Sequence, residues 1–450
     1  MKRLFISLTA TVLTTMLMPV SVRASGLAFD AAGNLYVADS SKHSVFKYTP
    51  DGTKSTFVAG LKGPIGLCFD SKGNLFVSDE AATDVKSRRS ILKFTPDGKR
   101  STFATGISSV GMAFDRSGNL FVSQGDSIFK FTPKGVESTF VTSKGANFID
   151  LAFDEAGNLF VVDQALTKSW LGRSIIKITP DGAKSTFAAG LEEPRDLTVD
   201  ATGNVYVSGN HAILRFTPEG TKNTFSSASG ADEASDLAID RSGNVFVWNG
   251  RDAVLKFDPS GTPTTFASDL VSPDKQWEYK CADGVWPEIV KAGTTQVVLE
   301  PSRDLDVNRA GEAEVVWAPD SKRFAFNYTK PSAHHTFYHS TALYQLRGDK
   351  WVLLRSPVDE SSERLQLAQL TKEGLPKSAY SPDADWSQDI LKLRKWTDAN
   401  TAILYAYAVW ADGSHHRRAA FLFTMKFDPE GNWKIVKTHQ MLKKELEEEQ

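Results

Sequence analysis

Short stretches in which apolar and polar residues alternate recur along the first 270 positions. The stretch "FDEAGNLFVVD", residues 153–163, joins an Asp-x-x-Gly-Asn turn to an alternating strand, and near-copies are "FDAAGNLYVAD", "FDSKGNLFVSD", "FDRSGNLFVSQ", "VDATGNVYVSG" and "IDRSGNVFVWN". The turn asparagines are spaced 40, 45, 39, 46 and 40 residues apart: Asn34, Asn74, Asn119, Asn158, Asn204 and Asn244. Each copy predicts four short strands, as in "GLAFD", "NLYVAD", "SVFKYTP" and "KSTFVAG".

Repeats of this length that contain only strands indicate the blades of a β-propeller. A blade is apolar on both faces, so the six copies are expected to close into a ring over residues 26–270. The sequence does not reveal what locks the ring, although the segment around Trp277 is a candidate. Because six whole blades fit within residues 26–270, this part is expected to fold alone.

Two kinds of polar residue occur in every copy and have structural explanations. The turn aspartates can accept hydrogen bonds from the backbone amides that follow, while the turn glycine adopts positive φ: Asp30, Asp70, Asp115, Asp154, Asp200 and Asp240. A basic residue lies in the third strand of each copy, where its aliphatic stem is expected to pack between blades: Lys47, Lys93, Lys130, Lys177, Arg215 and Lys256.

A second domain is expected at residues 275–450, where the repeat stops and eight of the ten tryptophans lie. The pattern predicts an antiparallel, β-rich α+β domain. Its hairpins are "AEVVWAPDSKRFAFNYT" and "TALYQLRGDKWVLL", its further strands are "AILYAYAVW" and "AAFLFTMKFDPEGNWKIV", and its helices are "SSERLQLAQL" and "THQMLKKELEEEQ".

Residues 1–24 have a basic start, an apolar run and a small-residue end, which is typical of a cleaved signal peptide. No cysteine directly follows the run, so we expect a secreted or periplasmic protein without a lipid anchor. The formal net charge of −2 gives no electrostatic support for nucleic-acid binding. No later apolar run is long enough to span a membrane. A monomer is expected, with Cys68 acting as a small apolar residue inside a repeat strand.

The repeats differ where their first strand begins. Three copies have glycine there, namely Gly26, Gly66 and Gly111, and three have aspartate, namely Asp150, Asp196 and Asp236. One half of the channel mouth is therefore expected to be acidic. The carboxylates could cap backbone amides or pair with Arg195, or they could hold a divalent cation such as calcium, which prefers oxygen ligands. Asp163, at the end of a second strand, adds to this polar ring.

The loops between the second and third strands are longest in the second and fourth copies. They contain "EAATDVKSRRS" and "QALTKSWLGRS" and contribute Arg88, Arg89, Trp170 and Arg173. Basic and aromatic side chains on both sides of the shorter third copy predict a groove above the acidic mouth. Solvated surface loops without a partner are the alternative.

The motifs "GLAFDAAGNLYVAD" and "NHAILRFTPEG" resemble those of NHL-type six-bladed propellers, and more broadly those of the gluconolactonase, strictosidine synthase and streptogramin lyase superfamily. His211 and His43 stand at NHL-like histidine positions. The resemblance implies a six-bladed fold that hosts hydrolases, lyases and binding modules. Gluconolactonase-like enzymes hold their metal through Asn-Gly or Asp-Gly pairs, whereas the aspartates here lie one position later and should face the other way. The C-terminal domain resembles no family that we recognise.

These observations favour a binding or scaffold protein with a protein or small polar ligand at the mouth of the propeller. The alternative is a metal-dependent hydrolase or lyase of the gluconolactonase or streptogramin lyase type.

Overall fold

The computed structural model describes the chain from residue 26 onward, with gaps. The described residues are 26–79, 90–107, 111–165, 173–209, 212–227, 236–249, 253–280, 287–301, 305, 313–329, 338–355, 385–412, 415–442 and 445. All named elements within these residues are strands. No helix in the described residues is both long and apolar enough to cross a membrane.

Six four-stranded antiparallel sheets follow one another along the described residues up to Ser268. The first three contain β1 Leu27–Phe29, β2 Leu35–Asp39, β3 Ser44–Tyr48 and β4 Lys54–Ala59; β5 Pro64–Phe69, β6 Leu75–Asp79, β7 Ser90–Phe94 and β8 Arg100–Thr105; and β9 Met112–Phe114, β10 Leu120–Gln124, β11 Ser127–Phe131 and β12 Glu137–Thr142. The next three contain β13 Phe148–Phe153, β14 Leu159–Asp163, β15 Ser174–Ile178 and β16 Lys184–Ala189; β17 Leu197–Val199, β18 Val205–Gly209, β19 Ala212–Phe216 and β20 Lys222–Ser226; and β21 Asp236–Ile239, β22 Val245–Trp248, β23 Ala253–Phe257 and β24 Pro263–Ser268.

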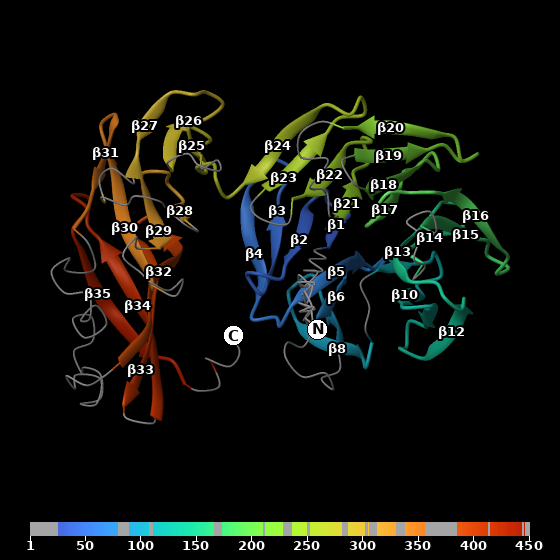
Figure 1. The fold of residues 1–450 in the computed structure, drawn as a ribbon, viewed down its shortest axis with the longest axis horizontal. Helices are drawn as coiled ribbons and strands as arrows, with labels where there is room; N and C mark the ends of the chain where they lie inside the picture. Colours follow the sequence, from blue (N-terminus) through green and yellow to red (C-terminus); the bar gives the residue numbers. More distant parts are fainter. Residues whose placement is uncertain are drawn as a thin grey trace, which may run out of the picture.

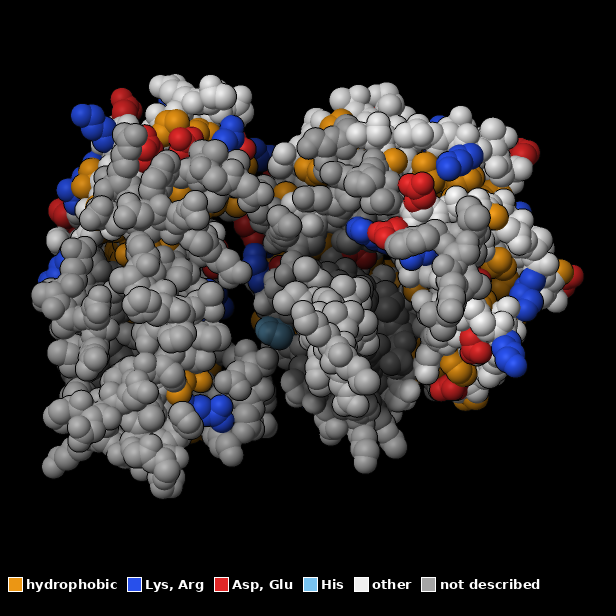
Figure 2. Space-filling model, in the orientation of Figure 1, with side chains coloured by type: hydrophobic (Ala, Val, Ile, Leu, Met, Phe, Trp, Pro, Cys, Tyr) orange, Lys and Arg blue, Asp and Glu red, His pale blue; other side chains and the backbone are white. Residues whose placement is uncertain are grey.

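The first strand of each sheet contacts the first strands of the two neighbouring sheets, and β21 returns to contact β1. The sheets therefore form a closed ring with β1, β5, β9, β13, β17 and β21 innermost, as Figure 1 shows. This arrangement is a β-propeller. On the face drawn in Figure 2, acidic and basic side chains are interspersed over the described surface.

The predicted turn chemistry is confirmed in all six sheets. Each turn aspartate accepts the backbone N–H of the asparagine four residues on at 2.8–2.9 Å and its side-chain N–H at 2.7–2.8 Å. The turn glycines have φ of 77–83°, a region that favours glycine. Each sheet therefore repeats one fixed register between its first two strands.

The basic residue of each third strand lies over the aromatic ring opposite it in the second strand. Its charged group is 5.3–5.9 Å from the ring centroid: Lys47 over Tyr36, Lys93 over Phe76, Lys130 over Phe121, Lys177 over Phe160, Arg215 over Tyr206 and Lys256 over Phe246. The expected packing of the stem between blades stays a prediction, and the cation gains an attraction to the ring that the sequence pattern did not predict.

Aromatic rings also join neighbouring sheets. Tyr36 of the first sheet makes edge contacts with Phe57 of its own sheet at 5.1 Å and with Phe69 of the next at 5.0 Å. Equivalent three-ring contacts join the second sheet to the third, the third to the fourth, and the sixth to the first. Cys68 lies buried among the apolar residues between the second and third sheets, and its thiol is free.

The remaining strands form two further sheets. A three-stranded sheet contains β25 Trp277–Lys280, β26 Glu288–Lys291 and β27 Val297–Leu299. An eight-stranded sheet contains β28 Glu314–Trp317, β29 Arg323–Thr329, β30 Tyr338–Arg347, β31 Lys350–Leu353, β32 Asp385–Asp398, β33 Thr401–Asp412, β34 His415–Phe427 and β35 Trp433–Gln440. Both expected hairpins are present, as β28–β29 and β30–β31.

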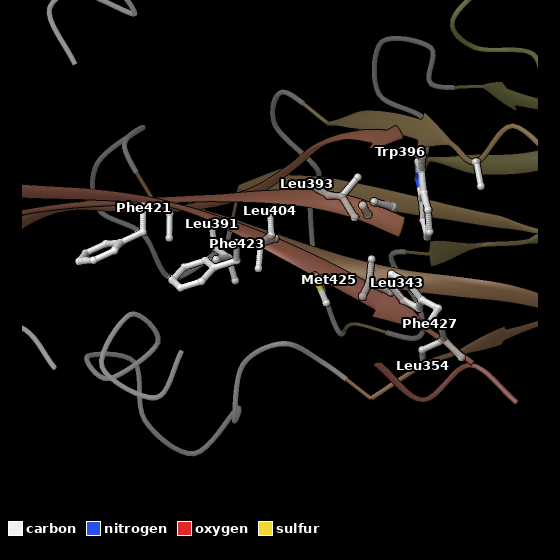
Figure 3. Close-up of a cluster of buried hydrophobic side chains, with 14 of the residues drawn as sticks. Leu343, Leu354, Leu391, Leu393, Trp396, Leu404, Phe421, Phe423, Met425 and Phe427 are labelled. Carbon is white, nitrogen blue, oxygen red and sulfur yellow. The ribbon is translucent and has the colours of Figure 1, made fainter. Parts of the chain in front are cut away.

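One apolar cluster packs the three-stranded sheet against β28–β31, and another lines the opposite face of the eight-stranded sheet, where Figure 3 shows Leu391, Leu404 and Phe423 together. Two sequence predictions are corrected here. The expected helix "THQMLKKELEEEQ" is wrong at its start, because Thr438–Gln440 belong to β35 and pair with β34. The sheet is also not wholly antiparallel, since β30 and β32 pair in parallel. The other expected helix, at 361–370, lies outside the described residues.

Candidate functional site

Three carboxyl groups stand where adjacent inner strands begin. Asp150 lies in β13, Asp196 comes directly before β17, and Asp236 is the first residue of β21. These strands follow one another in the ring. The structure thus places the three aspartates on one half of the inner ring of strands, at or next to the start of each strand.

The first two carboxyl groups each reach the next inner strand. Asp150 Oδ2 accepts the backbone N–H of Leu197 at 2.9 Å. Asp196 Oδ2 accepts the backbone N–H of Leu237 in the same way. An innermost strand has a free edge, and a buried backbone donor on that edge needs an acceptor. Capping of backbone amides, one of the sequence-based alternatives, is therefore observed for Asp150 and Asp196.

The carboxyl groups of Asp150 and Asp196 also lie close enough for each to influence the pKa of the other. Burial raises the pKa of Asp196 well above its usual range, and the negative charges of Asp150 and Asp236 raise it further. Burial also raises the pKa of Asp150, although hydrogen bonds from Asp196 and from the amides of Leu197 and Leu151 oppose this. Both side chains keep some accessible surface but are surrounded by protein atoms. A protonated carboxyl beside an ionised one is the arrangement that relieves the repulsion of two close acids.

Steric crowding explains why glycines begin inner strands in the other half of the ring. A Cβ on Gly26 would lie 2.6 Å from the backbone N of Leu67, and a Cβ on Gly111 would lie 2.6 Å from the Cα of Asp150. Real Cβ atoms do not approach so closely, so neighbouring inner strands need glycine at these points. The mouth is therefore asymmetric, with close backbone contacts on one side and bridging carboxyl groups on the other.

The polar residues that end the second strands organise the connections between sheets. Asp79 Oδ1 accepts the backbone N–H groups of Lys62 and Gly63 at 2.9 and 2.8 Å. Asp163 Oδ1 accepts those of Asn147 and Ala165 at 2.8 and 2.9 Å. Asp163, a candidate ligand-binding residue, thus has one oxygen engaged in holding the entry to its own inner strand.

Three serines near the ends of second strands were missed by the sequence analysis. The hydroxyl of each accepts the amide at the start of the adjacent inner strand: Ser78 from Gly66, Ser123 from Gly111 and Ser208 from Asp196, at 2.8–3.2 Å. The sequence carried a signal for them, because "LFVSD", "LFVSQ" and "VYVSG" share this serine and the other three copies lack it.

The basic candidates that the structure describes contact a different acid. Arg195 is exposed and lies 3.4 Å from Glu193, and Arg173 lies 3.9 Å from the same carboxylate. Arg195 and Asp196 are adjacent in sequence, but Arg195 is exposed whereas Asp196 is partly buried. The expected pairing of Arg195 with the aspartates is therefore not the observed arrangement. Arg88, Arg89 and Trp170 lie outside the described residues.

The carboxyl half-ring does not fit a resident metal as it stands. One carboxyl oxygen each of Asp150 and Asp196 accepts a backbone amide, and burial raises the pKa of both acids, which favours the protonated form that does not bind a cation. No three His, Cys, Asp or Glu side chains of the described residues are grouped to hold a metal ion. His43 has φ of 50°, and its Nδ1 lies 3.0 Å from the carbonyl oxygen of Lys62; His211 lies outside the described residues.

Comparison with known proteins gives one family match and several similar structures. The family model of the NHL repeat matches residues 22–48. No curated protein matches the chain. A virginiamycin B lyase from Staphylococcus aureus is 14% identical over 59% of this chain and 91% of its own, with a TM-score of 0.42. A gluconolactonase from Xanthomonas campestris is 14% identical over 67% of this chain and 91% of its own, with a TM-score of 0.40. An auxiliary nutrient binding protein from Bacteroides ovatus is 14% identical over 53% of this chain and 68% of its own, with a TM-score of 0.42.

Proposed function

We propose that this chain is an exported binding or scaffold protein whose six-bladed, NHL-like β-propeller, residues 26–270, presents a ligand or partner site at its channel mouth. The six four-stranded sheets and their cyclic contacts support the blade count. The basic start, apolar run and small-residue end of residues 1–24 support export. The part from residue 275 onward would serve interaction or stability.

The observation that carries the proposal is the half-ring of Asp150, Asp196 and Asp236 at the mouth. Acids that face one another in a partly desolvated opening attract a group that brings positive charge or several hydrogen-bond donors. A small polar cation, or a lysine or arginine of a protein partner, meets both conditions. Binding such a group should release protons, because it favours the ionised acids and burial raises the pKa of Asp150 and Asp196.

Binding fits the geometry better than metal-dependent hydrolysis does. The oxygens of Asp150 and Asp196 already hold strand-edge amides, and the nearby bases pair with Glu193. The two close carboxyl groups of Asp150 and Asp196 keep a hydrolase or lyase as the second candidate, since burial raises the pKa of both and a protonated carboxyl beside an ionised one can act as a general acid and base.

The two candidates are separated by titrating the chain with spermidine, Ca²⁺ and Mg²⁺ in a calorimeter, in two buffers with different ionisation enthalpies. Spermidine is expected to bind with release of protons. Asp196→Asn should abolish that release and weaken binding about tenfold, as expected for the loss of one interaction of about 1.4 kcal/mol. Asp258→Asn, at an exposed turn of the sixth sheet, should change neither quantity.

A panel of lactones, incubated with and without Ca²⁺, completes the test. Turnover that requires the ion and disappears in Asp196→Asn would establish the hydrolase instead. Failure of all three cations to bind would remove the acidic half-ring as a binding site.

A further inference from the structure

The contact between the first and sixth sheets, which closes the ring, differs from the other contacts between neighbouring sheets. The first sheet, β1–β4, and the sixth, β21–β24, are each formed by four consecutive strands, so no described strand is exchanged between them. Their apolar contact resembles those between the other sheets. Closure between the two ends of the repeat therefore depends on side chains, and the residues after β24 differ from those after the other fourth strands.

In three other sheets the fourth strand is followed by a glycine with positive φ and a buried aliphatic residue. The pairs are Gly60-Leu61, Gly106-Ile107 and Gly190-Leu191, and each aliphatic residue packs between its own sheet and the next. The sixth sheet has Asp269-Leu270 at this position, and Asp269 does not have positive φ. The backbone therefore departs from the repeated conformation at Asp269. Asp269 and Leu270 contact residues that their counterparts in the other sheets do not.

Asp269 binds the first sheet. Its two carboxylate oxygens accept hydrogen bonds from Lys54 of β4 and from Lys42, each at 2.5 Å. Lys54 Nζ also lies 4.0 Å from the ring centroid of Phe46. These partners are more than 200 residues away in sequence, and all three charged side chains are between a quarter and a third exposed. A half-buried carboxylate shared by two cations is held more firmly than an exposed ion pair.

Leu270 binds the C-terminal sheets instead of a next blade. Its side chain packs against the aromatic cluster that contains Trp277, Phe324 and Trp351. Its carbonyl oxygen accepts the backbone N–H of Tyr279 at 2.7 Å and the indole N–H of Trp317 at 3.3 Å. Leu270 thus packs on the C-terminal aromatic cluster, whereas its counterparts Leu61, Ile107 and Leu191 pack on the following sheet.

The segment then returns to the first sheet. The Asp274 amide donates to Ser321 Oγ at 2.9 Å, and Lys275 Nζ donates to the carbonyl oxygen of Asp51 at 3.2 Å. Residues 268–277 are therefore bonded on one side to the first and sixth sheets and on the other to β25, β28 and the turn before β29.

We propose that residues 268–277 are a joint that closes the ring and couples it to the C-terminal sheets, so that both unfold as one cooperative unit. On this basis the ring over residues 26–270 depends on the C-terminal sheets for its stability. Loss of the contacts between the joint and the propeller sheets should therefore lower the stability of the C-terminal sheets, and the reverse should also hold.

The test compares two lysines at the same position of the repeat. Lys54→Met breaks the closing contact and keeps an unbranched apolar side chain, whereas Lys184→Met changes the equivalent residue of β16, which donates to Thr142 O at 3.4 Å instead. By calorimetry the unaltered full chain should show one transition. Lys54→Met should lower its midpoint by about 2–4 °C or more, and Lys184→Met by clearly less.

Hydrogen exchange gives the second readout and distinguishes coupling from a local effect. In Lys54→Met, exchange should accelerate both in β4 and in β25, which Lys54 does not touch. Asp269→Asn should reproduce this pattern from the other side of the contact. Two separate transitions in the unaltered chain, equal effects of the two lysine variants, or acceleration confined to β4 would each overturn the proposal.

Discussion

Replacing Asp196 by asparagine should make the protein relatively more stable as the pH rises. The folded pKa of Asp196 is raised by burial and by the charges of Asp150 and Asp236, so folding favours the protonated acid. Between the usual carboxyl pKa and the raised folded value, the folded state binds more protons than the unfolded state. Stability therefore falls as the pH rises through this window, by about 1.4 kcal/mol per pH unit for one proton.

Asparagine removes this loss without removing the hydrogen bonds. Its amide can donate to Asp150 as the protonated acid does, and its oxygen can accept the Leu237 N–H. The free energy of unfolding of Asp196→Asn, minus that of the unaltered chain, should therefore increase by up to about 1.4 kcal/mol per pH unit until the folded pKa is passed. The difference cancels the pH dependence of the groups that do not interact with Asp196.

Urea denaturation from pH 4 to pH 8, followed by tryptophan fluorescence, measures this difference. Asp258→Asn serves as the control. Hydrogen bonds from Ser260 and Thr262 lower the pKa of Asp258, so its contribution is lost only as the pH falls below the usual carboxyl pKa, and its difference should stay nearly flat from pH 4 to pH 8. The reasoning would be refuted by a difference for Asp196→Asn that stays flat, or that falls as the pH rises, since Asp196 would then be ionised in the folded protein.

Three further outcomes are expected from other contacts. Asp154→Ala removes both hydrogen bonds to Asn158 and should lower the free energy of unfolding by about 1–2 kcal/mol, measured by urea denaturation. Arg323→Lys should cost about 3 kcal/mol and alter the near-UV circular dichroism, because the buried guanidinium donates to four acceptors on three separate segments. In a Cys281→Ser background, the Cys68 thiol should not react with a thiol reagent until the protein unfolds, since burial raises its pKa and covers it.

The repeat made much of the ring predictable, because each copy specifies its own contacts locally. The hydrogen bonds between Asp30 and Asn34 lie within one turn, and six copies of the turn confirm one another. The attraction between Lys47 and Tyr36 was also within reach, since the register of adjacent strands places them opposite each other.

Contacts between distant segments could not be inferred in this way. Asp150 and Asp196 are 46 residues apart, and only their proximity in the fold shows that each shifts the pKa of the other. Similarly, Thr438–Gln440 precede a lysine- and glutamate-rich segment that favours helix, but pairing with β34 decides their conformation. Backbone pairing with a long neighbouring strand therefore outweighs local helix propensity.

The three-ring contacts between sheets imply an uneven resistance to local opening around the ring. Where the fourth sheet meets the fifth and the fifth meets the sixth, Val199 and Ile239 occupy the inner-strand position that carries phenylalanine at Phe29, Phe69, Phe114 and Phe153. Each of these two junctions lacks one edge-to-face pair, worth about 0.5–1.5 kcal/mol beyond the buried area. Spontaneous separation of blades should therefore begin on this arc. The acidic half of the mouth lies on the same arc, so transient opening there would admit water and small solutes to carboxyl groups that the closed ring largely shields.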